Sequence, residues 1–552
     1  MSQRVPVLIV GGGPVGMMLS AELGWRGISS LLVERDPPEE RLKFSRILVI
    51  SVRTMELLRR LGASDRVRNW GFPLDFPLDN VFVTSLNGYE LGRFKMYSLG
   101  SAREDPYSPE HQWHCPQIVF DPIMQELAAS FPASAIRYRT RLVAIEQDAA
   151  RVVATIEDAA GAQEQIEAQY LVGCDGFTGS VRKLLGIGTH GVEFIDHSLN
   201  IEFRVDDLAR YHDKGDAGRY ICLGPEGTWG TCMVVDGKGL WRILMYGETD
   251  KLSAADVRSI IRRLAGRDFP FEVVSCVPWS RRALMAERFR QGRVFLAGDA
   301  AHVHPPNGGF GMNTGIGDAS DLGWKLEAVL RGWAELALLD SYEIERMPIC
   351  QRVIDEAMKE LARLKGNRRL PEIDQPGEAG DKLRGEISAR LRKEFSGSRV
   401  WHRWGIHLGY LCDPSPIIVP DGTARPQDDT YDYAPNARPG SRAPHIWLAP
   451  GRSVLDLFGR HHVLLCFSGA SEEVAGFRAA AAQRGMPLEI HELASGEGAR
   501  LYEKRLVLVR PDGYVAWRGD QADDPLAIID RVRGRRRPGR ARLSRARDFP
   551  IS

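Results

Sequence analysis

The first residues that could do chemistry form a glycine-rich loop close to the start of the chain. Gly11, Gly13 and Gly16 stand at G-x-G-x-x-G spacing, with Pro14 and Val15 between the last two. Glycine permits a tight turn and lets the backbone approach a pyrophosphate, whose charge the N-terminus of a following helix stabilises. The spacing therefore predicts a dinucleotide site.

The elements around this loop are those that such a site needs. The apolar run 5–10 predicts a strand buried on both faces, and the segment after the loop predicts a helix that ends at Gly27. Residues 28–33 predict a second strand, with Glu34 and Arg35 at its end. An acid in this position can accept both hydroxyls of an adenosine ribose, which favours FAD or NAD over NADP.

A second glycine-rich segment favours FAD. An apolar run at 293–298 predicts a strand that ends at Asp299, and a carboxylate placed there can bind a polyol chain such as ribityl. Prolines stiffen the following loop, and glycines let its backbone approach a flat ring. A helix predicted from about residue 312 would turn its N-terminal N–H groups toward a ring edge on which negative charge develops. The residues of this segment are Pro305, Pro306, Gly308, Gly309, Gly311, Met312 and Asn313.

A third segment, 170–176, predicts a strand that ends at Asp175 and Gly176, with Arg182 after a short turn. By itself this is a common turn signal. In this order, the three segments resemble the class A flavoprotein monooxygenases, which are aromatic hydroxylases with the para-hydroxybenzoate hydroxylase fold. The resemblance covers roughly residues 5–355.

The resemblance implies roles for individual residues. Glu34 would hold the adenosine ribose, Arg46 would contact the pyrophosphate, and Gln117 would lie near the flavin. Asp175 belongs to an element linked to both FAD and the nicotinamide cofactor, and Asp299 would bind the ribityl chain. The full set of cofactor-binding residues predicted in this way is Gly11, Gly13, Pro14, Val15, Gly16, Glu34, Arg35, Arg46, Gln117, Asp175, Asp299, Pro306, Gly309, Gly311, Met312 and Asn313.

The expected fold class is α/β. A Rossmann-like FAD-binding domain would carry an inserted, mainly antiparallel β-sheet substrate domain and a C-terminal thioredoxin-like α/β domain. The C-terminal region has no C-x-x-C, so we expect it to have a structural or dimer-contact role. The expected boundaries are 1–190 and 286–372 for the FAD-binding domain, 191–285 for the substrate sheet, 373–440 for a helical segment and linker, 441–535 for the thioredoxin-like domain and 536–552 for a basic tail.

Candidates for substrate contact come from the inserted sheet and from the second glycine loop. Short alternating runs between 190 and 285 predict antiparallel strands. Their alternation offers Tyr220, Trp229, Met233, Trp241 and Met245 as wall residues. The catalytic candidates are Pro305, Pro306, His302 and Tyr220, with His304 as a comparable alternative to His302.

The function that the resemblance implies is an FAD-dependent monooxygenase that consumes NADH or NADPH and O2. It would hydroxylate a phenolic or polycyclic aromatic substrate through a C4a-hydroperoxyflavin. Two alternatives stay open from the sequence: a Baeyer–Villiger or epoxidising flavin monooxygenase on a polyketide-like substrate, and a flavin-binding protein that does not turn over. The intact loop from Pro305 to Asn313 argues against the last.

The composition is that of an ordinary globular protein, with 552 residues, 43% hydrophobic and 26% charged. The net charge is +1, which gives no reason to expect a nucleic-acid partner, although residues 531–552 hold nine arginines and one aspartate. Eight cysteines are scattered without metal-site spacing, so we expect a reduced, cytoplasmic setting and no metal. No apolar run is long enough to span a membrane, and a homodimer is expected.

Overall fold

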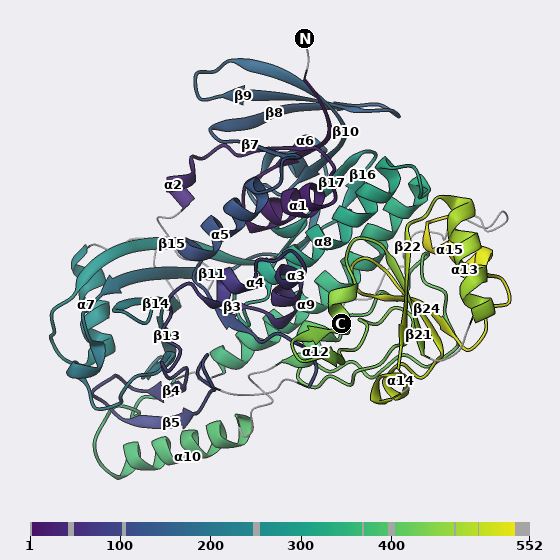
Figure 1. Cartoon of the computed structure of the whole chain (residues 1–552). Coiled ribbons are helices and arrows are strands. Elements are labelled where there is room, and N and C mark those ends of the chain that lie inside the picture. Colours follow the sequence, from purple (N-terminus) through teal and green to yellow (C-terminus); the bar gives the residue numbers. More distant parts are fainter. Residues whose placement is uncertain are drawn as a thin grey trace.

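The computed structural model describes residues 3–41, 49–101, 106–246, 254–366, 369–395, 403–467, 471–494 and 496–535. Three bodies follow one another in the fold: a domain built on a largely parallel sheet, a second sheet inserted into it, and a C-terminal domain, which we define as residues 441–535 (Figure 1). The expected α/β fold class is confirmed.

The first sheet holds the glycine loop at the carboxyl ends of its strands. Its order is β16-β17-β10-β1-β2-β7, and β8 and β9 extend it from β10. The strands from β17 to β7 pair in parallel, and Val7–Val10 of β1 lie against residues 30–33 of β2. The strands are β1 (Gln3–Val10), β2 (Ser30–Val33), β7 (Ser134–Arg137), β8 (Thr140–Gln147), β9 (Val152–Asp158), β10 (Gln163–Gly173), β16 (Arg290–Gln291) and β17 (Val294–Leu296).

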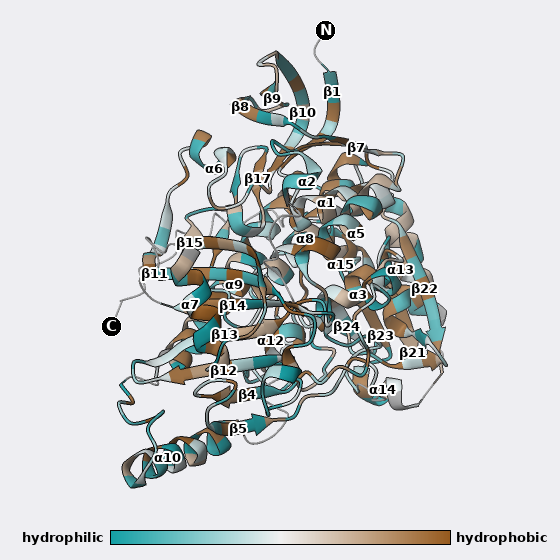
Figure 2. Ribbon diagram, turned by 90° about the vertical axis from the view of Figure 1, so that its left-hand side faces the viewer, coloured by the Kyte–Doolittle hydropathy of each residue, from teal (hydrophilic) through white to brown (hydrophobic). Residues whose placement is uncertain are grey.

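Helices pack against this sheet because their apolar residues face its buried strands. α8 runs through the middle of the molecule, beside α1 and α9 (Figures 1 and 2). Residues of α1, α5, α8 and α9 share one hydrophobic core with the sheet. The helices of this domain are α1 (Pro14–Trp25), α2 (Pro38–Arg41), α3 (Val52–Arg60), α4 (Ser64–Arg68), α5 (Gln117–Ala129), α6 (Ser180–Leu184), α8 (Gly311–Leu330) and α9 (Asp340–Lys365).

The inserted sheet is larger than the expected segment 191–285. Its order is β18-β15-β11-β14-β13-β12-β4-β5, so β4 and β5 join it from far earlier in the chain, and β12 pairs in parallel with β4. The sequence pattern missed these strands because pairing between distant segments leaves no local signal. The strands are β4 (Asn80–Val83), β5 (Glu90–Phe94), β11 (Thr189–Arg204), β12 (Arg219–Gly224), β13 (Gly227–Val234), β14 (Leu240–Tyr246), β15 (Glu272–Ala286) and β18 (His302–Val303), and β3 (Val49–Ile50) pairs separately with β6 (Trp113–His114).

The two faces of the inserted sheet have different neighbours. α7 (Ala254–Ala265) covers one face with Val257, Ile261 and Leu264, which belong to the same core as the aromatic residues of the strands. The other face looks toward the first domain. At its far edge, α10 (Glu378–Glu394) packs on β4, β5 and β12 through Ile387 and Leu391. We call this second face the inner face.

The C-terminal domain is a four-stranded sheet flanked by helices, as expected for the thioredoxin-like region. The order is β22-β21-β23-β24, with β21 parallel to β22 and antiparallel to β23. β21 and β23 are wholly buried and strongly hydrophobic (Figure 2). The elements are β21 (His462–Phe467), α13 (Ser471–Arg484), β22 (Leu488–Leu493), α14 (Glu497–Tyr502), β23 (Leu506–Val509), β24 (Val515–Gly519) and α15 (Pro525–Val532), and before them α12 (Trp404–Leu408), β19 (Trp447–Ala449) and β20 (Arg452–Ser453).

The first arginines of the arginine-rich segment 531–552 belong to the folded C-terminal domain. Arg533 is buried and donates to the carbonyl of Trp333 at 2.9 Å and to Glu335 at 2.9 Å. It is therefore part of the fold, and residues 536–552 lie outside the described residues. In the part of the chain that the structure describes, no helix has the length and apolar character needed to cross a membrane.

Candidate functional site

The glycine loop after β1 is packed so tightly that only glycine fits at its ends. Gly11 has a φ of +107°, and a Cβ there would lie 2.4 Å from the carbonyl oxygen of Cys174. A Cβ on Gly16 would lie 2.0 Å from the carbonyl oxygen of Gly11. These contacts draw α1 against the loop, as the spacing of the glycines led us to expect.

The N-terminus of α1 presents donors to whatever the loop holds. The first hydrogen bond within the helix runs from the N–H of Met17 to the carbonyl of Gly13. The N–H groups of Val15 and Gly16 therefore have no acceptor within the helix, and Pro14 has no N–H to satisfy. This end of the helix suits an anion such as a pyrophosphate.

Glu34 lies buried beside the same loop. Its Oε2 accepts a hydrogen bond from the N–H of Gly12 at 2.6 Å, and its Oε1 accepts one from the N–H of Asp36 at 2.9 Å. A Cβ on Gly12 would stand only 3.0 Å from the side chain of Glu34. The carboxylate is thus held in one place next to the loop. Arg35 is exposed and pairs with Asp36 at 3.2 Å.

Two aspartates end neighbouring parallel strands at this edge. Asp175 follows β10. Its Oδ2 accepts hydrogen bonds from the N–H of Val181 at 3.0 Å and from the hydroxyl of Ser180 at 3.4 Å, so the carboxylate of Asp175 caps the start of α6. Burial raises the pKa of Asp175, and these hydrogen bonds oppose the rise. Asp299 lies in a short 3-10 turn (Gly298–Ala300) after β17, and its side chain is exposed. Of the two, Asp299 is the more exposed to solvent.

The N-terminus of α8 forms a second donor edge. Its first internal hydrogen bond runs from the N–H of Thr314 to the carbonyl of Phe310, so the N–H groups of Gly311, Met312 and Asn313 have no acceptor within the helix. Pro305 is buried in the loop before it and Pro306 is exposed. The positive φ of Gly308 and Gly309 explains why glycine stands there.

The side chain of Asn313 is fully used within the protein. Its Oδ1 accepts hydrogen bonds from the N–H of Ser51 at 2.9 Å and from the hydroxyl of Thr54 at 2.7 Å. Its Nδ2 donates to the carbonyls of Gly309 at 2.7 Å and Val49 at 3.0 Å. What Asn313 can offer a ligand is its backbone N–H.

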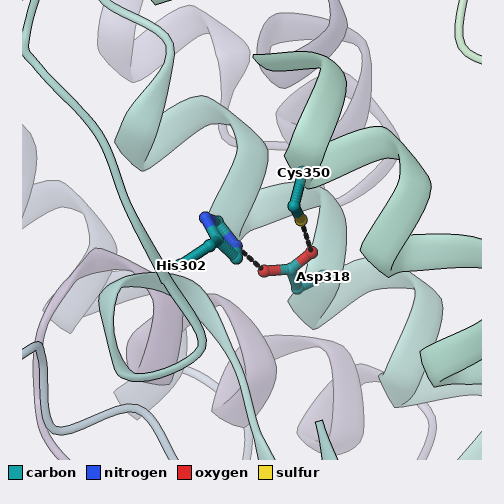
Figure 3. A group of neighbouring side chains, drawn as sticks. All are labelled: His302, Asp318 and Cys350. Atoms are coloured by element: carbon teal, nitrogen blue, oxygen red, sulfur yellow. Dashed lines mark hydrogen bonds and ion pairs between the residues drawn. The ribbon is translucent and has the colours of Figure 1, made fainter. Parts of the chain in front are cut away.

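His302 lies behind the loop, contrary to its expected catalytic role. It is 1% exposed, and its Nε2 is 2.7 Å from Oδ2 of Asp318 (Figure 3). The other oxygen of Asp318 accepts from Arg346 at 2.7 Å and faces the thiol of Cys350 at 4.0 Å. Oδ2 also accepts from the N–H of Gly298 at 3.0 Å. Asp318 therefore ties together the loop that carries Asp299, α8 and α9.

Among the described residues, His302, Asp318 and Cys350 are close enough to be considered as metal ligands. Burial disfavours the charged imidazole, but Cys350 and Asp318 outweigh it and raise the pKa of His302 well above its usual value. A protonated imidazole cannot bind a cation, and the guanidinium of Arg346 already neutralises Asp318. We interpret the group as a hydrogen-bond network.

His304, unlike His302, has a buried ring nitrogen without a hydrogen-bond partner among the described residues. Its Nδ1 is 2.8 Å from the carbonyl of Pro305, and its Nε2 has no hydrogen-bond partner within the described residues. Burial lowers the pKa of His304 to about 4, so the ring is neutral at pH 7. Nδ1 must then donate to Pro305, which leaves Nε2 as an acceptor.

The structure shows which face of the inserted sheet each side chain lies on, and this corrects the wall residues expected from the sequence. Tyr220, Trp229 and Trp241 lie in the core under α7, and Met245 packs against that core. The hydroxyl of Tyr220 donates to the carbonyl of Gly215. Tyr220 is therefore a core residue and not a catalytic one.

The inner face carries polar residues that the sequence interpretation missed. Arg219, Met233, Arg242 and Glu202 are direct cross-strand neighbours on four strands and so share this face. Met233 packs with Ile118, next to Gln117 at the start of α5. Charged residues inside otherwise apolar strands were the signal that could have found Arg219 and Arg242.

Arg219 stands out on this face. No hydrogen bond or ion pair holds its guanidinium within the described residues. Burial lowers the pKa of Arg219, repulsion from Arg403 lowers it further, and Tyr246 opposes the shift. Arg403 itself lies over the ring of Phe310, with 5.5 Å between its guanidinium carbon and the ring centre. The loop before α8 and Arg219 thus bound the same region.

Arg242 has a nearby acid. Burial lowers the pKa of Arg242 to about 10; the charge of Glu202 opposes this and that of Arg219 adds to it. Arg242 is therefore charged at neutral pH. Glu202 faces Arg242, and Glu360 pairs with Arg403 at 2.7 Å, so each of these two arginines has an acid nearby.

A cavity lies on α8 between the first domain and the C-terminal domain. Its lining includes Arg53, Phe310, Asn313, Asp321, Arg346 and Tyr514.

Gln117, expected near the ring, is buried and donates to Asp121 at 3.1 Å. Arg46, expected at the pyrophosphate, lies outside the described residues.

Comparison with family models agrees with this geometry. Residues 4–357 match a model described as an FAD binding domain, and residues 436–535 match one described as aromatic-ring hydroxylase, C-terminal.

Named relatives cover almost the whole chain. The 4-methyl-5-nitrocatechol 5-monooxygenase of a Burkholderia species is 33% identical over 95% of this chain and 96% of its own length. The tetracenomycin A2 monooxygenase-dioxygenase of Streptomyces glaucescens is 33% identical over 97% of this chain and 98% of its own. A solved structure of RebC, soaked with chromopyrrolic acid and with bound 7-carboxy-K252c, has a TM-score of 0.90 and 37% identity, covering 97% of this chain and 100% of RebC.

Proposed function

This chain belongs to the FAD-dependent aromatic monooxygenases, and we propose that its substrate carries an acidic group that Arg219 binds. The expected enzyme class is confirmed: it is an FAD-dependent hydroxylase of a phenolic or polycyclic aromatic compound, with NAD(P)H and O2 as co-substrates. The acidic group on the substrate is the part that we propose.

The residues of the first domain fit FAD. Glycines let the loop pack closely between β1 and α1, the N–H groups at the starts of α1 and α8 have no acceptor within their helices, and Asp299 is exposed. Glu34 would hold the adenosine ribose, Val15 and Gly16 the pyrophosphate, and Asp299 the ribityl chain. When bound, FAD supplies hydride acceptance from NAD(P)H and the activation of O2 for insertion of one oxygen atom into the ring.

The observation that carries the proposal is the state of Arg219. Arg219 is half-buried and has no partner among the described residues. A guanidinium in that state costs stability, and a ligand that supplies the counter-charge would remove the cost. Arg242 and Arg403 lie in the same region, but Glu202 faces the first and Glu360 pairs with the second at 2.7 Å, so Arg219 is the charge left to a ligand. A carboxylate is the group that a guanidinium binds best, because two parallel N–H···O bonds can form.

The solved relative gives independent support. The ligand in the RebC structure is named 7-carboxy-K252c, and the soaked compound is an acid by name. That protein shares 37% of its residues with this chain over nearly their full lengths.

The chain's own groups would orient the ring once the acid is bound. The carboxylate on Arg219 fixes one end of the substrate against the inner face. Phe310 and Met233 supply apolar contact that keeps water from the reacting carbon.

A panel of matched aromatic compounds tests the proposal. Each pair differs only in a carboxylate, and FAD-loaded protein is assayed for NADH and NADPH oxidation, oxygen uptake and peroxide release. We expect the acid of a pair to stimulate oxidation with little peroxide and to gain one oxygen atom. Equal stimulation by the neutral partners would reject an acidic substrate. The product structure separates ring hydroxylation from Baeyer–Villiger or epoxide products.

The homodimer and the cytoplasmic location expected from the sequence stay predictions. Light scattering of the purified protein measures the first, and fractionation of the source cells measures the second.

A further inference from the structure

Helix α3 is bound to the C-terminal domain by every charged residue it has. Arg53 donates to the carbonyl of Asp512 at 2.5 Å, and Arg60 donates to the carbonyl of Pro511 at 3.1 Å. Arg59 donates to Asp456 at 2.7 Å. The fourth charged residue, Glu56, pairs with Arg442. The sequence gives no reason for so many links between a short helix and a distant domain.

The pair formed by Glu56 and Arg442 is the most buried of these links. Nε of Arg442 donates to Glu56 at 3.0 Å and a second guanidinium nitrogen donates to its other oxygen, while Arg442 also donates to the carbonyl of Tyr107 at 3.1 Å. The two side chains are 3% and 1% exposed. Burial would raise the pKa of Glu56, but Arg442 and Arg53 outweigh it and hold the pKa below its usual value.

The other end of α3 holds the residue at the start of α8. Ser51 caps α3, and its N–H donates to Oδ1 of Asn313; the hydroxyl of Thr54 donates to the same oxygen. Nδ2 of Asn313 in turn holds the carbonyl of Gly309. The first part of α3, from Ser51 to Glu56, therefore joins Arg442 to Asn313 and to the loop before α8.

We propose that Arg442 is a positioning residue through which the C-terminal domain fixes Asn313 and the N-terminus of α8 against FAD. Arg442 is 1% exposed, and its guanidinium is bonded to Glu56 and to the carbonyl of Tyr107. It acts by fixing Glu56, and with it the position of α3. This gives the C-terminal domain, which lacks a redox motif, a role in the flavin site. The proposal requires FAD binding and is independent of the acidic substrate.

Flavin properties, rather than turnover, give the test. In Arg442→Met, the FAD dissociation constant should rise by about tenfold, the size typical of losing a residue that orients a ligand-contacting group. The flavin midpoint potential should fall, because a displaced helix N-terminus stabilises the negative charge of the reduced ring less well. Arg442→Lys keeps the charge but not the paired bonds, so its values should lie between those of Arg442→Met and the wild type.

A matched control separates positioning from general destabilisation. Arg518 is 4% exposed in the same domain and pairs with Asp421 at 2.7 Å and Glu503 at 2.8 Å, without contact to α3. Arg518→Met should lower the thermal midpoint as much as Arg442→Met does, yet leave FAD affinity and potential at wild-type values. Equal flavin changes in the two variants would overturn the proposal.

A milder change covers the case in which Arg442→Met does not fold. Glu56→Gln keeps the size of the side chain, removes its charge and replaces one of the two oxygens that accept from Arg442 by an amide donor. We expect it to raise the FAD dissociation constant and lower the potential in the same direction. Wild-type values for both in folded Glu56→Gln would overturn the proposal.

Discussion

Replacing Arg219 by methionine should separate substrate binding from stability. Methionine keeps much of the length of the side chain but removes the charge and all five donors. Among the residues that the structure describes, no acid or carbonyl bonds to Arg219 and would lose its partner, and Arg403 would no longer meet a repelling charge. The thermal midpoint of Arg219→Met should therefore equal or exceed that of the wild type.

The effect on an acidic substrate is set by the hydrogen bonds that are lost. A hydrogen bond to a charged group contributes about 1.5–3 kcal/mol, so kcat/KM for the acid should fall about 10- to 150-fold. For the matched neutral aromatic, which makes no such bond, kcat/KM should change less than about threefold. Arg219→Lys should recover part of the loss, since it keeps a charge but cannot bind in two places.

The assay compares acid and neutral partners in NAD(P)H oxidation and product formation, with unfolding followed on the same samples. Arg204→Met is the matched control, because Arg204 lies on the same sheet but is exposed and pairs with Asp236 at 3.6 Å. Its kinetics should match the wild type. An equal loss with both partners in Arg219→Met, or a large fall in its thermal midpoint, would refute the reasoning and show a structural role for Arg219.

Three further changes address the cofactor loops. Asp299→Ala should loosen FAD, measured by the flavin retained on dialysis; full retention would contradict its role at the ribityl chain. Gly16→Ala should abolish FAD binding, since its Cβ would lie 2.0 Å from the carbonyl of Gly11, and a yellow purified protein would contradict this. Asp318→Asn should destabilise the fold most between about pH 4 and 6.5. Burial opposes the lowering of the pKa of Asp318, but Arg346 and His302 outweigh it, and the stability that this gives is lost in acid. The raised pKa of His302 gives stability that is lost as the pH rises. Urea unfolding from pH 3.5 to 9 measures this, and a constant difference from the wild type would contradict it.

The cofactor half of the protein could be predicted from the sequence because its signals are local. The strand before Gly11, the helix after it and the acid at Glu34 lie within one short unit, and each residue type is required by the backbone at that point. The same holds for the segment from Asp299 to Asn313. The structure places these residues as the spacing indicated.

The inserted sheet shows what the sequence could not supply. Alternation in β12 to β14 tells which residues share a face, but it does not tell which face is covered by α7 and which looks toward the first domain. Large aromatic residues such as Tyr220 and Trp241 were natural wall candidates, yet burying them under α7 removes more apolar surface from water. Arg219 and Arg242 therefore lie on the inner face, on either side of Met233.

The sequence by itself determined the cofactor, the order of the elements and the family of reactions, because those depend on contacts between residues close in the chain. The tertiary structure decided that His302 pairs with Asp318, that Arg219 has no partner among the described residues and how the C-terminal domain reaches α8. Each of these depends on residues far apart in sequence, such as the 386 positions between Glu56 and Arg442. Burial of a charge is compensated only by partners that folding brings to it, and no local pattern records them.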